Sequence, residues 1–200
     1  MPPKAKFTKE EIIMAGLNIA RREGISELTA RSLGAELGCS ARPVFTVFSG
    51  MEEVQKAVKD AARALYDEYV TAGLCSPMPF KGTGMAYIRF AREEPKLFQM
   101  LFMTETDENL KINGVLKRID GNNEKILQAV VENYGLSIDA AGKFYRHLWI
   151  YSHGVATLLA TKVCSFEEGE ISEMLSEAAR GILQKIKEQE NDGNKKGNRN

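Results

Sequence analysis

The segment from Thr29 to Phe48 reads TARSLGAELGCSARPVFTVF and contains two short helical patterns on either side of Gly38. Thr29 and Ser40 belong to the residue types that cap helix starts. Apolar residues recur at helical spacing on both sides of the glycine, at Leu33, Leu37, Val44 and Val47. The segment therefore predicts a short helix after Thr29, a tight turn at Gly38, and a further helix over residues 41–48.

Gly34, four residues before this turn, is small where two crossing helices would approach each other most closely. Such a combination of glycine and apolar positions is typical of a helix-turn-helix, whose second helix presents one face to a DNA groove. A generic helical hairpin shares the spacing and the glycine, so the exposed side has to distinguish the two. Arg42 falls in the first turn of the predicted recognition helix, where side chains meet base edges, and this favours DNA binding.

The predicted DNA-binding face combines three kinds of side chain. Hydroxyl groups and free N–H groups at helix starts bind phosphate, arginine reads guanine, and apolar groups suit the thymine methyl. The predicted DNA-binding residues are Lys6, Thr29, Arg31, Ser40, Ala41, Arg42, Pro43, Phe45 and Thr46. Lys4, Lys9, Arg21 and Arg22 add positive charge nearby, although each arginine is equally consistent with an ordinary solvated side chain.

Elsewhere almost every apolar cluster recurs every three or four residues, and no long alternating run indicates a strand. We expect an all-α chain of about nine helices, with an N-terminal three-helix helix-turn-helix domain and a C-terminal helical bundle. The expected divisions are residues 1–50 and 51–189, followed by a disordered tail over 190–200 that has no apolar residue.

Local signals mark several helix ends. Thr8 with Glu11, and Ser49 with Glu52, have the spacing of a capping box. The run SPMPFKG at residues 76–82 predicts a break between helices.

Composition excludes several classes of protein. The 200 residues contain 27 Lys plus Arg and 27 Asp plus Glu, so the chain does not coat nucleic acid by bulk positive charge. The three cysteines are scattered and odd in number, which excludes a disulfide framework, and none has zinc-ligand spacing to a histidine. The amino terminus has no secretion signal, and no apolar stretch is long enough to span a membrane. We expect a reduced, cytoplasmic protein without a metal site or a cofactor.

Several motifs resemble the tetracycline-repressor (TetR) family of transcriptional regulators. FTKEEI at residues 7–12 is similar to the opening helix of that family, and TARSLGAELGCS at 29–40 to its second helix and turn. Residues 43–54 resemble its recognition helix and the start of its connecting helix. WIYSHG at 149–154 looks like the Trp-x-x-x-His-Gly pattern of one branch's C-terminal domain, and residues 87–95 resemble the segment before a short helix of that domain.

The resemblance implies a homodimer on a pseudo-palindromic DNA operator and a pocket for a small apolar or amphipathic ligand. Candidate pocket residues are Met85, Phe90, Phe98, Met103, Trp149 and His153, because methionine and aromatic side chains form adaptable apolar walls. Candidate dimer residues are Leu148, Val155, Leu158, Ile171, Leu175, Ala178 and Ile182. For each of these residues, a place in the chain's own core is the alternative.

Two positions differ from the family pattern. The family commonly has tyrosine at Phe45 and lysine at Met51, so each substitution removes a phosphate contact. The alternative function is therefore a helical ligand-binding or interaction protein that has lost DNA binding. An enzyme has little support, since Cys164 or Ser152 with a nearby histidine is unaccompanied by any glycine-rich or nucleophile-elbow motif, and no catalytic residue is predicted.

Overall fold

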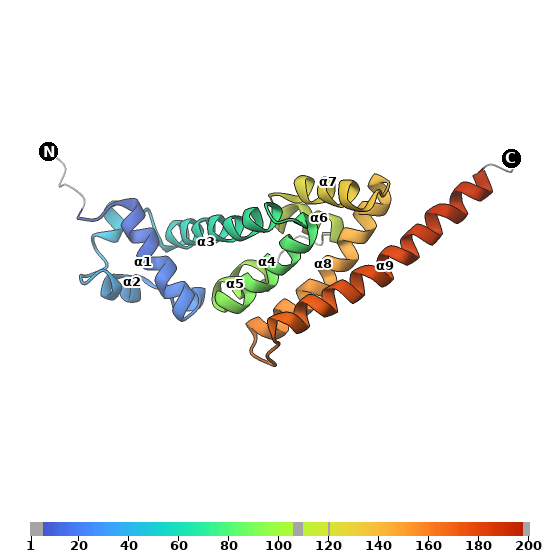
Figure 1. The fold of residues 1–200 in the computed structure, drawn as a ribbon. Helices are drawn as coiled ribbons and strands as arrows, with labels where there is room; N and C mark the ends of the chain where they lie inside the picture. The colour runs from blue at the N-terminus through green and yellow to red at the C-terminus, as the bar shows by residue number, and fades with distance from the viewer. Residues whose placement is uncertain (1–5, 106–109, 120, 198–200) are drawn as a thin grey trace. The chain divides into compact units, whose positions relative to one another are not determined.

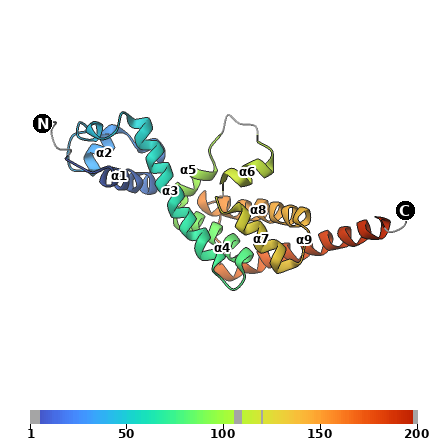
Figure 2. The same cartoon turned by 90° about the horizontal axis from the view of Figure 1, so that it is seen from above.

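The computed structural model describes residues 6–105, 110–119 and 121–197. These ranges form nine α-helices and two single turns of 3-10 helix (Figure 1, Figure 2). The α-helices are α1 (Lys9–Arg22), α2 (Ala30–Glu36), α3 (Met51–Leu74), α4 (Pro79–Glu93), α5 (Pro95–Phe102), α6 (Ile112–Ile119), α7 (Asn123–Tyr134), α8 (Ile138–Ala160) and α9 (Glu168–Gly197). The 3-10 turns are η1 (Ile25–Glu27) and η2 (Val44–Thr46). No described residue lies in a strand, so the all-α prediction is confirmed.

The helices divide into two compact units. The first contains α1, α2, the residues of α3 up to Tyr66, and α5; the second contains the end of α3 from Asp67, α4, and α6 to α9. The predicted boundary at residue 50 instead placed all of α3 and α5 in the C-terminal part. The two divisions differ because the first part of α3 packs on α1 at Gly16 and bonds to the Leu28 carbonyl, whereas its end packs on α4 at Gly82.

The first helix begins where the sequence indicates. The Thr8 side chain accepts a hydrogen bond from the Glu11 N–H at 3.2 Å, and Glu11 Oε2 accepts one from the Thr8 N–H at 2.8 Å. This reciprocal pair is the predicted capping box, and it satisfies two N–H groups that the helix start would otherwise leave free. At the start of α3 the pairing differs from the prediction, because Ser49 bonds to Glu53 rather than to Glu52.

The core of the first unit forms where α1 crosses α3. A Cβ atom at Gly16 would lie 2.7 Å from the side chain of Val58, so the glycine lets the two helices approach closely. Leu28 and Leu33 are fully buried beside this crossing. Lastly, the Arg21 Nε donates to Glu94 Oε2 at 2.8 Å and joins α1 to the residue before α5.

The core of the second unit is aromatic. Phe80 on α4 packs against Tyr134 on α7 and against Phe144 and Tyr145 on α8, with ring centroids 5.4–6.1 Å apart. These rings are large apolar groups, and their packing, edge-to-face for Tyr134 and Tyr145 and tilted for Phe144, holds the three helices together. Helices α8 and α9 lie side by side, and α9 extends past the start of α8 (Figure 1).

The predicted disordered tail is corrected by the course of α9. This helix continues to Gly197, and residues 198–200 lie outside the described residues. Side-chain contacts to α8 account for part of the extension: Ser137 Oγ donates to Glu190 Oε1 at 2.5 Å, and Lys143 Nζ donates to Gln189 Oε1 at 2.6 Å. Helix propensity does not explain the rest of the extension, because Asn191, Asp192, Gly193 and Asn194 are poor helix formers.

The predicted break at 76–82 is shorter than expected, since α4 already begins at Pro79, a residue that fits a first helical turn. Two glycines bring α3 and α4 together beside it. A Cβ atom at Gly73 would lie 2.6 Å from the Gly82 carbonyl oxygen, and one at Gly82 would lie 2.3 Å from the Gly73 carbonyl oxygen. Only glycine permits this backbone approach.

Candidate nucleic-acid interface and cavity

The segment between α2 and α3 has the geometry of a tight helix-turn-helix connection. Thr29 caps α2, because its side chain accepts from the Ser32 N–H at 3.1 Å. Gly38 has φ +63°, which favours glycine at the turn. A Cβ atom at Gly34 would lie 2.9 Å from both the Ala41 nitrogen and the Cys39 carbonyl oxygen. The close approach predicted at Gly34 is therefore present, and it is an approach to the backbone of the turn.

The predicted recognition helix over residues 41–48 is wrong in length and type. The structure has turns on both sides of η2, which covers Val44–Thr46, and Pro43 rather than Ser40 precedes it, with no side-chain cap. The Thr46 hydroxyl donates to the Pro43 carbonyl at 2.7 Å, and the Thr46 N–H donates to the same oxygen at 3.2 Å. Three β-branched residues and this competing hydroxyl favour the tighter 3-10 pattern over an α-helix.

The predicted DNA-binding side chains form a mainly exposed set. Phe45 is 44% exposed, which is unusual for a phenylalanine, and Arg42 and Thr46 are also exposed. The exposed predicted residues are Lys6, Thr29, Arg31, Ser40, Arg42, Phe45 and Thr46, and the half-buried ones are Ala41 and Pro43. The neighbouring Val44 is fully buried. The turn therefore places Val44 in the core and Phe45 in solvent.

Ion pairs separate the nearby cations into two groups. Arg21 pairs with Glu94, and Arg22 pairs with Glu23 and Glu36, which raises the pKa of Arg22 through hydrogen bonds first to Glu36 and then to Glu23. By contrast, Arg31 and Arg42 have no acidic partner among the described residues.

The lysines near the amino terminus are placed differently from each other. Lys9 Nζ lies 3.7 Å from Glu53 Oε1 and over the Phe48 ring, so it is committed to contacts within its own unit. Hydrogen bonds from the N–H and hydroxyl of Ser49 lower the pKa of this glutamate. Lys6 Nζ lies over the Phe7 ring at 5.2 Å, and Lys4 falls outside the described residues.

No cavity that the structure describes is lined by more than one of the six predicted pocket residues. Phe98 and Met103 belong to the first unit, where Phe98 is buried against Phe102 and Met103 is exposed. Phe90 is fully buried, with its ring against that of Tyr69. These positions were predicted from residue type, and residue type alone does not separate a cavity wall from a filled core.

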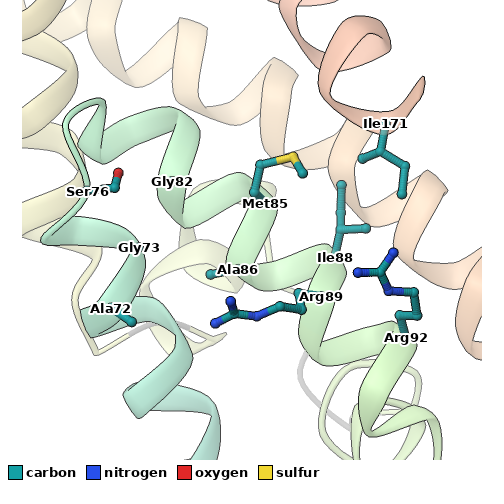
Figure 3. A pocket seen from close by; sticks show the side chains of 10 residues that line it. All are labelled: Ala72, Gly73, Ser76, Gly82, Met85, Ala86, Ile88, Arg89, Arg92 and Ile171. Carbon is teal, nitrogen blue, oxygen red and sulfur yellow. The ribbon is translucent and has the colours of Figure 1, made fainter. Parts of the chain in front are cut away.

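Met85 is the predicted pocket residue that does line a described cavity. The cavity has a volume of about 190 Å³ and lies between the end of α3, helix α4 and Ile171 of α9 (Figure 3). Its lining residues are Ala72, Gly73, Ser76, Gly82, Met85, Ala86, Ile88, Arg89, Arg92 and Ile171. The two arginines were not predicted from the sequence, although two cations three residues apart at the end of a largely apolar stretch of α4 gave a usable signal.

Trp149 and His153 form a separate cluster with Tyr87. The Trp149 and His153 rings are stacked with centroids 4.9 Å apart, and Tyr87 Oη lies 2.8 Å from His153 Nδ1. Burial lowers the pKa of His153, so the neutral imidazole is favoured and can accept a hydrogen bond from the tyrosine hydroxyl. This arrangement joins α4 to α8 and uses the histidine for packing.

Four of the seven predicted dimer residues are buried within a single chain. Leu148, Val155, Ile171 and Leu175 are at most 7% exposed, which corrects their assignment to a dimer surface. Helical spacing identifies an apolar stripe but not what covers it. The remaining three, Leu158, Ala178 and Ile182, are exposed or half-buried.

The exposed apolar strip of α8 combines the predicted dimer residue Leu158 with Ile150 and Gly154, which the sequence analysis did not name. Ile150 is 51% exposed and Leu158 is 38% exposed, and Gly154 lies between them with no other atom within 4 Å of a built Cβ. The three residues are four apart, so they share one face of the helix.

A comparison with protein-family models finds one match that covers half of the chain. Residues 80–181 match the tetracyclin repressor-like C-terminal domain. The chain belongs to the TetR family. A search of curated proteins found no match. Regulators of the TetR family are generally not enzymes.

Two further observations concern the part of this TetR family protein that the structure describes. None of its helices there combines the length and the apolar character that crossing a membrane requires. Its described residues also contain no group of three or more His, Cys, Asp or Glu that could hold a metal ion.

Proposed function

We propose that the protein is a ligand-responsive transcriptional regulator, acting as a repressor, that binds a pseudo-palindromic DNA operator as a homodimer. The observation that supports DNA binding most strongly is the exposed pair Arg42 and Phe45, beside a tight turn, in a member of a family of regulators. Because Arg42 has no acidic partner among the described residues and the Phe45 ring is 44% exposed, both side chains are available to contact another molecule.

Direct base contacts in this proposal come from few side chains. Arg42 has the guanidinium geometry that bonds guanine in the major groove. Phe45 has no hydroxyl, so its ring contacts the thymine methyl instead of a phosphate. Arg31 and the N–H groups at the start of α2 then hold the backbone phosphate. We expect half-sites that contain one critical G·C pair next to T-rich steps.

A single copy of this short turn reads too few bases to bind tightly, so the proposal requires a dimer. The exposed strip of Ile150, Gly154 and Leu158 on α8 supports such a dimer, together with the half-buried Ala178 and Ile182 on α9. Two-fold symmetry lets the same strip meet itself, and the glycine allows the two α8 helices to approach closely. The dimer then presents two copies of the turn to a palindromic site.

The specific observation that favours the alternative function is the form of the recognition segment. It is a single 3-10 turn, and Phe45 and Met51 remove two polar contacts to phosphate. A protein that has lost DNA binding would keep the cavity and the α8 strip but would show no salt-dependent retention on duplex DNA.

Selection of bound fragments from a random duplex pool tests the proposal and identifies the operator at once. We expect enrichment of an inverted repeat whose half-sites share a G·C pair. Enrichment of no sequence, or binding that ignores salt, would favour the alternative. The Arg42→Ala variant serves as the matched control, since it should lose the enriched sequence while remaining folded.

A further inference from the structure

The cavity beside α4 combines positive charge with apolar walls. Two of its ten lining residues are arginines, none is acidic, and most of the others are apolar. We propose that this cavity binds a small organic carboxylate with a compact apolar body, and that this acid is the effector of the regulator. The regulatory part of this inference rests on the proposed function, whereas the binding part does not.

The size of the cavity limits the ligand. An engineered protein cavity of about 150 Å³ binds benzene, and the cavity here has about 190 Å³. It therefore has room for a ring or a short branched chain together with one carboxylate group.

Arg89 provides the anchoring charge. Its guanidinium lies over the Tyr69 ring at 5.0 Å, and Tyr69 packs edge-to-face on the buried Phe90 at 5.3 Å. A cation–π contact of this kind leaves the N–H groups of the guanidinium for hydrogen bonds. A carboxylate matches the planar fork of N–H groups in geometry and charge, and the ring contact favours this position of the arginine before the ligand arrives.

Arg92 lies toward the other side of the cavity. Figure 3 shows Arg89 extending toward α3 and Arg92 lying on the side of Ile171 of α9, and Ile88 and Met85 line the same cavity. These apolar side chains suit the body of the ligand, and flexible methionine adapts to its shape. Arg92 already has an interaction of its own, so Arg89 supplies the hydrogen bonds to the carboxylate.

Ser76 adds a polar group without a partner. Its hydroxyl oxygen is buried and has no hydrogen bond among the described residues. A buried hydroxyl that lacks a partner destabilises a protein, and a carboxylate oxygen in the cavity would supply one. The Ser76 hydroxyl lies beside Gly82, where the backbones of α3 and α4 approach each other closely. A ligand that bonds to this hydroxyl is therefore next to the contact between the two helices.

The location of the cavity suggests how the acid could act. Ala72, Gly73 and Ser76 line it from the end of α3 and its following turn, and Arg89 lines it from α4. A ligand that contacts both segments selects one arrangement of the α3 end against α4. Helix α3 is continuous from Met51, which follows the recognition segment. We therefore expect binding of the acid at the end of α3 to change the affinity for DNA.

Isothermal titration of the full chain tests the proposal with benzoate as the probe. Benzamide is the neutral control of the same shape, and inorganic phosphate is the control for an anion without an apolar body. We expect benzoate to bind at least about 10-fold more tightly than either, because a charge-assisted hydrogen bond accounts for roughly that factor. Arg89→Met should weaken benzoate by about 10- to 100-fold, and Arg180→Met, an exposed arginine of α9 outside the cavity, should not.

A second variant and a DNA assay separate the remaining outcomes. Met85→Trp fills the cavity without touching charge and should also abolish benzoate binding. The proposal is overturned if wild-type chain does not bind benzoate, if benzamide or phosphate binds equally well, or if both variants bind as wild type does. If benzoate binds as described but no duplex is retained in the selection experiment, the proposed function fails while the cavity assignment stands.

Discussion

Replacing Gly34 with alanine tests the tight turn of the helix-turn-helix. The new Cβ atom would lie 2.9 Å from the Ala41 nitrogen and from the Cys39 carbonyl oxygen, whereas ordinary contacts begin at 3.4 Å. Both neighbours are backbone atoms, so the turn has to move by about 0.5 Å. Overpacking of this kind costs about 1–3 kcal/mol, and the better helix propensity of alanine returns roughly 0.5–1 kcal/mol. We expect a net destabilisation of about 1–2 kcal/mol.

Urea unfolding followed by two spectroscopic signals shows which of the two compact units the substitution destabilises. Far-UV circular dichroism reports all helices, while fluorescence of Trp149, the single tryptophan, reports the second unit. Gly34→Ala should lower the stability seen by circular dichroism and leave the fluorescence transition largely unchanged. Gly142→Ala is the matched control, because nothing lies within 4 Å of its built Cβ on α8, and it should stabilise by roughly 0.5–1 kcal/mol.

The same variant should bind DNA less well than its stability alone predicts, since the turn positions the recognition segment. A Gly34→Ala chain that is as stable as wild type and binds the selected duplex equally tightly would refute the reasoning about the close approach. An unstable Gly142→Ala chain would show instead that the comparison between glycines is unsound.

Three further substitutions test other parts of the molecule. Arg42→Ala should reduce discrimination against a mutated G·C pair by about 1–3 kcal/mol in fluorescence-anisotropy titrations, whereas the ion-paired Arg22→Ala should not; equal discrimination by both variants would exclude Arg42 as the base reader. Ile150→Glu should convert the dimer to a monomer in sedimentation velocity, and Ile138→Glu, at the exposed start of α8, should leave it a dimer; a dimer in both cases would place the interface elsewhere. Burial lowers the pKa of His153, so its contribution to stability is present above the unfolded pKa of about 6.5 and is lost as the pH falls below that value. Urea unfolding by circular dichroism should therefore show a larger loss between pH 7.5 and pH 5.5 for wild type than for His153→Gln, and equal losses would contradict this assignment.

Local signals in the sequence were sufficient to predict caps and turns whose interacting residues are close together along the chain. The capping box of Thr8 with Glu11, the cap at Thr29 and the turn at Gly38 all depend on residues within a few positions of each other. The recognition segment was harder to predict, because the balance between an α-helix and a 3-10 turn at Val44–Thr46 depends on small differences among competing hydrogen bonds.

Helical spacing could not identify which surfaces remain free. Leu148 and Leu158 have the same residue type on the same helix, yet one is buried in the chain and the other is 38% exposed. The cavity was missed for a related reason: it depends on α3, α4 and Ile171 of α9 meeting in space, and its most informative residue, Arg89, is charged. A search for apolar pocket residues passes over such a position.

A titration of the selected operator duplex, at several salt concentrations and at known protein stoichiometry, tests the central proposal most directly. The account predicts two chains per duplex and an affinity that falls steeply with salt, with a logarithmic slope of about −0.9 for each phosphate neutralised. Specific binding by one chain per duplex, or an affinity that salt does not change, would contradict it.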